Sequence, residues 1–322
     1  MVEILQALLN HFSDSCSRSN YMKKILVIGS MGFIGSAALR YYKSKGYYVV
    51  GCDVLDNAGE TNYFKVKKIK PNYKDLLKVV LPDLCLNASG AASVPFSFEN
   101  PTIDYELNVI NVLRILEAIR ENSSETALIN ISSAAVYGTP SESPISELCN
   151  LNPISPYGWH KRQSELLCSE YANLYGLKTC SMRVFSAYGP GLQKQLFWDL
   201  YQKTNEVKYI NLLGTGEESR DYIYVDDLIR ASETIAKATR FEGEAINVAS
   251  GIETSIRQAA KAFIEALGWD GEIKFTGSKR KGDPENWCAD IRKIKDMGFN
   301  SEFSLYDGLK AYCQWLQELN RL

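Results

Sequence analysis

The sequence predicts an α/β fold, in which a doubly wound parallel sheet is joined to a smaller C-terminal α/β lobe. Short apolar segments alternate with segments of helical periodicity up to about residue 185. This alternation is typical of parallel strands that helices cover on both faces. Beyond that point the pattern loosens into helix, strand, turn and helix, which indicates a second, smaller lobe. A chain of 322 residues suits one large α/β unit or two cooperating domains.

Five strands and four helices are expected in the first lobe. The strands lie in the segments KKILVIGS, YYVVGCD, LPDLCLNASG, TALINISS and LKTCSMRVFS, in chain order. Helices are expected over residues 33–45, 73–80, 101–121 and 156–175. Apolar residues recur at the helical period in the last two, for example at Val109, Val112 and Leu116.

The predicted boundaries divide the chain into three regions. Residues 1–21 form an N-terminal extension, residues 22–185 form the cofactor-binding domain, and residues 186–221 and 253–322 form the second lobe, with a return to the first domain at about 222–252. The extension has apolar residues at helical spacing but no basic segment before them, so it is not a secretory signal. Because Met22 opens an apolar strand like a natural start, we expect the extension to contribute little. A small docking helix is the alternative.

The composition argues against several classes of function. The formal net charge of −2 gives no basic footprint of the kind that nucleic-acid-binding proteins show. No apolar run approaches the ~20 residues that a membrane helix needs, so we expect no membrane contact. The eight cysteines are scattered without a CxxC pair and there are only two histidines, which argues against a zinc site. We expect a reduced, metal-free, cytoplasmic protein.

A glycine-rich turn directly after the first strand predicts a dinucleotide site. The segment VIGSMGFIGS places Gly29, Gly32 and Gly35 between this strand and the mouth of a helix. Glycines let the backbone approach a pyrophosphate, and the bare amides of a helix N-terminus attract it. The spacing is GxxGxxG rather than GxGxxG, and tight packing of strand against helix is the alternative explanation. The pattern favours a Rossmann-type fold.

An acidic residue at the end of the second strand indicates which dinucleotide binds. Asp53 lies 18 residues after Gly35, where a carboxylate can bind a ribose 2′-hydroxyl. The two residues after Asp53 are uncharged, so they offer no cation for a 2′-phosphate. We therefore expect NAD rather than NADP as the cofactor.

The segment SPYGWHK, at the start of the helix over 156–175, carries a candidate acid/base. Tyr157 and Lys161 are four residues apart and share one helix face. A neighbouring ammonium favours phenolate, which can accept a proton, although in isolation a surface Tyr and Lys are the commoner explanation of so short a pattern. Ser133, at the end of the fourth strand, could hydrogen-bond a sugar hydroxyl or keto oxygen. We interpret His160, one helical position round from Tyr157, as a bystander.

Together these motifs resemble a known enzyme family. The segments GFIG, SSAAVYG, SPYGWHK, RVFSAYGPG and SRDYIYVDDL look like those of the extended short-chain dehydrogenase/reductases, and most like the nucleotide-sugar epimerases and dehydratases of the UDP-glucose 4-epimerase type. The similarity runs in order from about Lys23 to Asp290. It implies that Tyr157 is the acid/base, that Lys161 lowers the pKa of Tyr157 and holds the nicotinamide ribose, and that Ser133 orients the reacting oxygen.

The resemblance also implies the contacts of cofactor and substrate. The residues that would bind NAD are Gly29, Gly32, Phe33, Ile34, Gly35, Asp53, Ala88, Ser89, Tyr157 and Lys161. The residues that would bind a nucleotide-diphosphate sugar are Ser93, Ser133, Ser186, Arg220 and Arg280. Relatives of this type commonly form homodimers, which implies a four-helix bundle made of the helices 101–121 and 156–175 from two copies. The apolar residues of these helices could equally belong to the core of a single chain.

The two arginines match positions that bind the substrate diphosphate in the family. A guanidinium fork suits phosphate oxygens, although a solvated face or a surface ion pair is the alternative for both Arg220 and Arg280. Asp221 is expected to orient Arg220 or the local turn. Ser186 replaces a frequent asparagine that touches the substrate phosphates, a departure that can alter the selection of sugar or nucleotide.

Two alanines argue against one of the reactions that the family catalyses. The 4,6-dehydratases of the family carry an Asp-Glu pair where this chain has Ala134 and Ala135, and alanine cannot transfer protons. The combined epimerase/reductases place a cysteine in this segment, where the chain has only Cys149 in a loop. An epimerase that returns the hydride to the opposite face, most simply at C4, therefore leads. A keto-sugar reductase, and an inactive NAD-binding protein of the same fold, are the alternatives, although Ser133, Tyr157 and Lys161 are all present.

Overall fold

A computed structural model describes residues 24–57, 59, 61–140, 142–278 and 286–319. Its largest unit is a parallel sheet of seven strands in the order β10-β6-β5-β4-β1-β2-β3. The strands are β1 (Lys24–Ile28), β2 (Tyr48–Asp53), β3 (Tyr63–Lys65), β4 (Leu84–Asn87), β5 (Ala127–Ser133), β6 (Thr179–Val184) and β10 (Glu242–Val248). The order reverses between β1 and β4, so the loops that follow these two strands diverge around a crevice.

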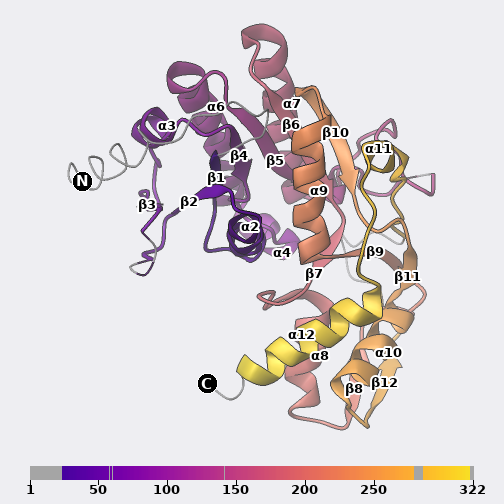
Figure 1. The fold of residues 1–322 in the computed structure, drawn as a ribbon. Coiled ribbons are helices and arrows are strands. Elements are labelled where there is room, and N and C mark those ends of the chain that lie inside the picture. The colour runs from indigo at the N-terminus through magenta and orange to yellow at the C-terminus, as the bar shows by residue number, and fades with distance from the viewer. Residues whose placement is uncertain (1–23, 58, 60, 141, 279–285, 320–322) are drawn as a thin grey trace.

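Helices cover both faces of this sheet (Figure 1). On one face, α2 (Phe33–Ser44), α9 (Val225–Ala238) and α11 (Arg292–Asp296) share an apolar core with the strands. On the other, α3 (Lys74–Val80), α6 (Asn111–Asn122) and α7 (Pro156–Tyr175) pack on a second core. The sheet is therefore buried on both sides, which explains why its strands read as continuous apolar runs.

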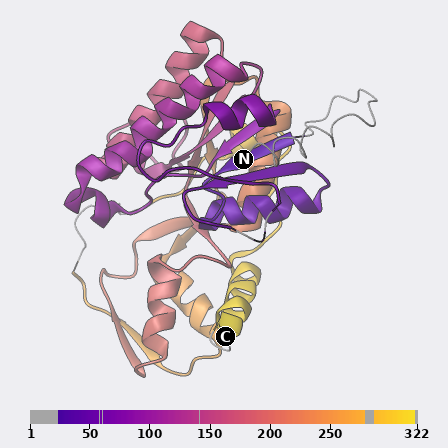
Figure 2. The same ribbon diagram turned by 90° about the vertical axis from the view of Figure 1, so that its left-hand side faces the viewer.

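A smaller group of elements lies beyond the carboxyl ends of the sheet strands, at the bottom of Figures 1 and 2. Its strands pair in the orders β11-β9-β7 and β12-β8. An aromatic core that includes Phe197, Phe263 and Tyr312 holds these elements together. The elements are β7 (Ser186–Tyr188), α8 (Gln195–Thr204), β8 (Tyr209–Leu212), β9 (Ser219–Tyr224), β11 (Glu253–Ser255), α10 (Ile256–Leu267), β12 (Glu272–Phe275) and α12 (Leu305–Leu319).

The predicted Rossmann-type α/β class is confirmed, with differences in detail. The expected return of the chain is made by α9 and β10, whereas β9 pairs with β7 and β11 in the smaller group. Strand β3 was not expected, because it has only three residues. The helix expected over 101–121 is α5 (Pro101–Tyr105), a π-helical turn over Glu106–Ile110 and α6. The predicted extension and the domain boundaries stay predictions, and residues 1–21 lie outside the described residues.

Local sequence fixes where α7 begins and ends. The Ser155 hydroxyl accepts the Gly158 amide at 3.2 Å and Pro156 occupies the first turn, which is a favourable start for a helix. Gly176, at φ 69°, ends the helix in the left-handed conformation. A Cβ at Gly158 would lie 2.5 Å from the Ala135 carbonyl oxygen. This glycine therefore lets α7 pack directly against the loop after β5.

In the part of the chain that the structure describes, no helix combines the length and apolar character needed to span a membrane.

We predict that Gly158→Ala displaces α7 from the Ala135 carbonyl and lowers the free energy of unfolding by about 1–3 kcal/mol, the usual cost of overpacking. Chemical denaturation measures this change. Gly59→Ala is the matched control, because its added Cβ meets open space. Equal stability of the two variants would show that α7 does not depend on this close approach.

Candidate active site

A cavity of about 770 Å³ lies at the carboxyl ends of the sheet strands, between the sheet and the smaller group of elements. Open α/β sheets bind ligands at this place. Most of the predicted site residues line it: Gly32, Phe33, Ile34, Ala88, Ser89, Ser93, Ser133, Tyr157, Lys161, Ser186 and Arg220. Gly29, Gly35 and Asp53 are not among the residues that line it, and Arg280 lies outside the described residues.

The glycine turn is tight because two of its glycines pack against backbone. Gly29 has a φ of 80°, and a Cβ there would lie 2.6 Å from the Ser89 amide nitrogen. A Cβ at Gly35 would overlap the Gly29 carbonyl. Gly29 thus packs against the loop after β4, and Gly35 packs α2 against the end of β1, while Gly32 borders the cavity. Gly32 precedes α2 without a side-chain cap, so the first amides of α2 are available to a pyrophosphate.

Asp53 connects the end of β2 to this turn. Its carboxylate accepts the Met31 amide at 2.9 Å and the Val54 amide at 2.7 Å. Each carboxylate oxygen has a second lone pair, so Asp53 can also accept ribose hydroxyls. The N-terminus of α2, Gly32 and the Asp53 carboxylate together form a site that fits NAD.

Tyr157 and Lys161 come from α7 and are both buried, with 9% and 5% of their surface exposed. The Lys161 ammonium donates a hydrogen bond to the Ile131 carbonyl at 2.9 Å and lies 5.9 Å from the centre of the Tyr157 ring. Burial raises the pKa of Tyr157 to about 12, while a hydrogen bond with Ser133 lowers it and the Asp104 carboxylate raises it. The Ser133 hydroxyl also accepts the Ala135 amide at 3.2 Å.

The expected lowering of the Tyr157 pKa by Lys161 is therefore not found in the chain itself. Desolvation is the largest influence on both groups, and it also lowers the pKa of Lys161 to about 8 against the opposing fields of Asp104 and Glu165. The ammonium donates its hydrogen bond to the Ile131 carbonyl and not to the Tyr157 hydroxyl.

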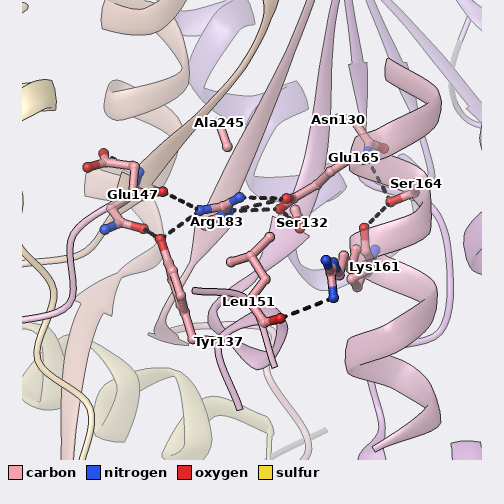
Figure 3. Close-up of polar contacts among 12 residues, drawn as sticks. Asn130, Ser132, Tyr137, Glu147, Leu151, Lys161, Ser164, Glu165, Arg183 and Ala245 are labelled. Carbon is pink, nitrogen blue, oxygen red and sulfur yellow. Dashed lines mark hydrogen bonds and ion pairs between the residues drawn. The ribbon is translucent and has the colours of Figure 1, made fainter. Parts of the chain in front are cut away.

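A buried polar network lies beside Lys161 (Figure 3). Glu165, one helical turn after Lys161, accepts hydrogen bonds from Ser132 at 2.5 Å and from the Arg183 guanidinium at 2.8 and 3.0 Å. Arg183 also donates to the Tyr137 hydroxyl at 2.9 Å. The network joins α7 to β5, to β6 and to the loop after β5. Sequence reasoning missed it, although an arginine inside an apolar strand signals a buried anionic partner.

The substrate side of the cavity presents the predicted serines and one arginine. The Ser93 hydroxyl caps α4 (Val94–Glu99) by accepting the Phe96 amide at 3.3 Å. Arg220 donates to the Ser219 carbonyl at 2.7 Å, and its guanidinium lies 5.8 Å from the centre of the Trp287 ring. Trp287 was not predicted, although it shares the wall with Arg220. Ser186 borders the same space from β7.

Asp221 orients the local turn, which is one of the two roles expected for it. It is fully buried and accepts hydrogen bonds from the amides of Ser250, Gly251 and Ala289. Burial raises its pKa to about 6 despite these bonds. It thereby fixes β9, and with it the strand position from which Arg220 reaches the cavity.

Comparisons with known proteins identify the family of the chain. The model of the NAD dependent epimerase/dehydratase family matches residues 25–249. The chain belongs to this family. A UDP-glucose 4-epimerase of Mycolicibacterium smegmatis is 28% identical over 302 residues, covering 89% of this chain and 96% of that protein.

Solved structures of UDP-sugar 4-epimerases share the fold over most of this chain. A UDP-N-acetylglucosamine 4-epimerase from Methanobrevibacter ruminantium, in complex with UDP-N-acetylmuramic acid, superimposes with a TM-score of 0.83 at 26% identity, over 92% of this chain and 99% of that one. A UDP-glucuronic acid 4-epimerase from Bacillus cereus, in complex with UDP-glucuronic acid and NAD, gives 0.82 at 27% identity with the same coverage.

We predict that Asp53→Ala weakens NAD binding about 10- to 100-fold, because it removes charged hydrogen bonds to the ribose. Affinity for NADP should change much less, since the lost carboxylate no longer repels a 2′-phosphate. Titration calorimetry with both dinucleotides measures the two effects. Asp56→Ala is the control, because Asp56 forms only an exposed ion pair with Lys65. Unchanged NAD affinity in Asp53→Ala would show that the ribose is held elsewhere.

Proposed function

We propose that this family member is an NAD-dependent epimerase of a nucleotide-diphosphate sugar, most simply at C4. One observation carries the proposal. Ser133, Tyr157 and Lys161 meet at one end of a single cavity, beside a turn that fits NAD, while Arg220 faces the same cavity from the smaller group of elements. The UDP-sugar 4-epimerases among its relatives support the position of the reaction and favour UDP-sugars as substrates.

Ser133, Tyr157 and Lys161 have separate roles in the reversible oxidation of the sugar carbon. The glycine turn and Asp53 would hold NAD, which would supply acceptance and return of a hydride at the sugar carbon and a positive charge that favours the Tyr157 phenolate. Tyr157 takes the proton of the sugar hydroxyl as the carbonyl forms, and gives it back when the hydroxyl is restored. Ser133 orients the reacting oxygen, and Lys161 holds the nicotinamide ribose and supports the phenolate.

The residues around the proposed keto intermediate disfavour the elimination of water. Ala134 and Ala135 follow Ser133 and are both buried, so neither position supplies a proton for the elimination of water. Arg220 is suited to the diphosphate, because guanidinium and phosphate form paired hydrogen bonds. The intermediate can then turn its other face to the hydride while the diphosphate stays bound. Retention of the cofactor, which such a cycle needs, agrees with the NAD preference expected from Asp53.

We also propose that two copies associate through α5, α6 and α7 in the cytoplasm. Exposed large apolar side chains in this region lie on α4, α5 and α7, and none of them lies on α6: they are Phe98, Ile103, Tyr105, Trp159, Leu166, Leu174 and Tyr175. A face of this kind on neighbouring helices is suited to a four-helix bundle. The seven cysteines of the described residues are all free thiols, which agrees with a reducing compartment.

We expect purified protein, without added cofactor, to convert one of the UDP-, GDP-, CDP- or dTDP-sugars into its epimer, separated by chromatography. Tyr157→Phe should lower this turnover by about 10²- to 10⁴-fold, the usual contribution of acid/base catalysis, while NAD stays bound. Reduction of a keto-sugar only after NADH or NADPH is supplied would identify a reductase instead. Near-normal turnover of the variant would remove Tyr157 from the acid/base role, and silence in every assay would favour an inactive NAD-binding protein.

We predict that Leu166→Glu, on the exposed face of α7, halves the mass measured by light scattering, because it places charge in the apolar interface. Val207→Glu is the matched control, since Val207 is also exposed but lies between α8 and β8 in the smaller group of elements. A monomeric mass for the unmodified protein would contradict the proposed dimer.

A further inference from the structure

Lys194 is a basic side chain of the cavity to which the proposed reaction gives no role. It lies at the start of α8 and lines the cavity together with Ala92 and Ser93, which belong to the loop after β4. Its ammonium donates a hydrogen bond to the Ala92 carbonyl at 3.2 Å. Lys194 therefore connects the smaller group of elements to the loop that carries Ser93, one of the residues expected to bind the substrate.

The Lys194 ammonium has no carboxylate partner in the part of the chain that the structure describes. Burial lowers the pKa of Lys194, and no carboxylate of these residues opposes that shift. The Ala92 carbonyl is a neutral acceptor. Because an ammonium has three N–H donors, Lys194 can donate to a ligand while its bond to Ala92 stays in place.

The charge of the cavity favours an anionic ligand. Among the described residues, more basic side chains than carboxylates line it: Lys161, Lys194, Lys203 and Arg220 against Asp199 and Glu218. The Glu218 carboxylate is already engaged, because it accepts hydrogen bonds from two backbone amides of its own turn. An excess of positive charge in a cleft attracts anions and strengthens their binding.

The segment that carries Lys194 has a defined conformation. Leu192 is buried, and its carbonyl accepts the Tyr312 hydroxyl of α12 at 2.5 Å. Gln195, the first residue of α8, has a φ of 68°, which residues other than glycine rarely adopt. Backbone strain of this kind persists where the surroundings hold it, and it clusters at ligand sites. Lys194 lies between these two positions, so its side chain approaches the cavity from a fixed backbone.

We propose that Lys194 is a substrate-binding residue that pairs with an oxyanion of the nucleotide-diphosphate sugar. This inference deepens the proposed function and rests on it. Such a substrate offers phosphate oxygens and, where the sugar is a uronic acid, a carboxylate as well. An ammonium forms charge-assisted hydrogen bonds with both groups. Lys194 thus either completes the diphosphate site opened by Arg220 or selects acidic sugars.

The test measures binding and needs no turnover. Protein saturated with NAD is titrated in a calorimeter with UDP, UDP-glucose and UDP-glucuronic acid. In Lys194→Met, which keeps an unbranched side chain without the charge, we expect the affinity for UDP-glucuronic acid to fall about 10- to 100-fold, the usual cost of losing a charged hydrogen bond. Lys194→Arg should restore most of this affinity, because it keeps the positive charge.

The other two ligands identify which oxyanion Lys194 binds. A similar fall for UDP and UDP-glucose assigns Lys194 to a phosphate, whereas unchanged affinity for both assigns it to the sugar carboxylate. Lys208→Met is the matched control. Lys208 is not among the residues that line the cavity, and its exposed ammonium lies 3.4 Å from the Asp270 carboxylate, so all three affinities should stay unchanged.

Unchanged affinity of Lys194→Met for UDP-glucuronic acid, or an equal loss in Lys194→Arg or in Lys208→Met, would overturn the inference. Weaker binding by Lys194→Met, in a protein that epimerises no sugar, would support the inference and refute the proposed function. An active epimerase whose affinities do not depend on Lys194 would refute the inference alone. Failure of the unmodified protein to bind any of the three ligands would contradict both the inference and the preference for UDP-sugars.

Discussion

The buried ion pair of Glu165 and Arg183 is the constraint on which the site depends. Glu165 stands one turn after Lys161 on α7, and Arg183 projects from β6, with Ser132 of β5 bonded to the same carboxylate. Ser133 and Tyr157 belong to two of these three elements. Because the geometry of a reacting site must be held to a fraction of an ångström, the contact between Ser133 and Tyr157 relies on how this network fixes α7 against β5.

Burial of Tyr157 and Lys161 has two opposing effects on the site. It excludes water from Tyr157 and Lys161, yet it disfavours the phenolate and the ammonium that the chemistry needs. The Asp104 and Glu165 carboxylates raise the pKa of Lys161 and so favour its ammonium. In the function proposed above, the positive charge of NAD would favour the phenolate.

Features encoded by neighbouring residues could be predicted from the sequence. The glycine turn and Asp53 belong to one strand–turn–helix unit, and Ser155 and Pro156 determine where α7 begins. The positions of this unit and of the start of α7 could therefore be predicted to within a residue or two. Partners brought together by the fold could not be predicted. Nothing in the sequence links His160 Nδ1 to the Asp104 carboxylate, which lies 2.5 Å away, or Glu165 to Arg183, because these contacts join different elements. The raised pKa of Tyr157 was missed for the same reason, since burial is a property of the packed molecule.

The most direct test of this account is the turnover number of the double variant Glu165→Leu/Arg183→Met, measured beside its thermal stability. Replacement of a buried pair by apolar residues is often neutral for stability, so we expect a melting temperature close to that of the unmodified protein. We expect turnover to fall by about 100-fold, because α7 is no longer held in register with Ser133. Full turnover in a stably folded double variant would contradict the claim that this ion pair positions the catalytic helix.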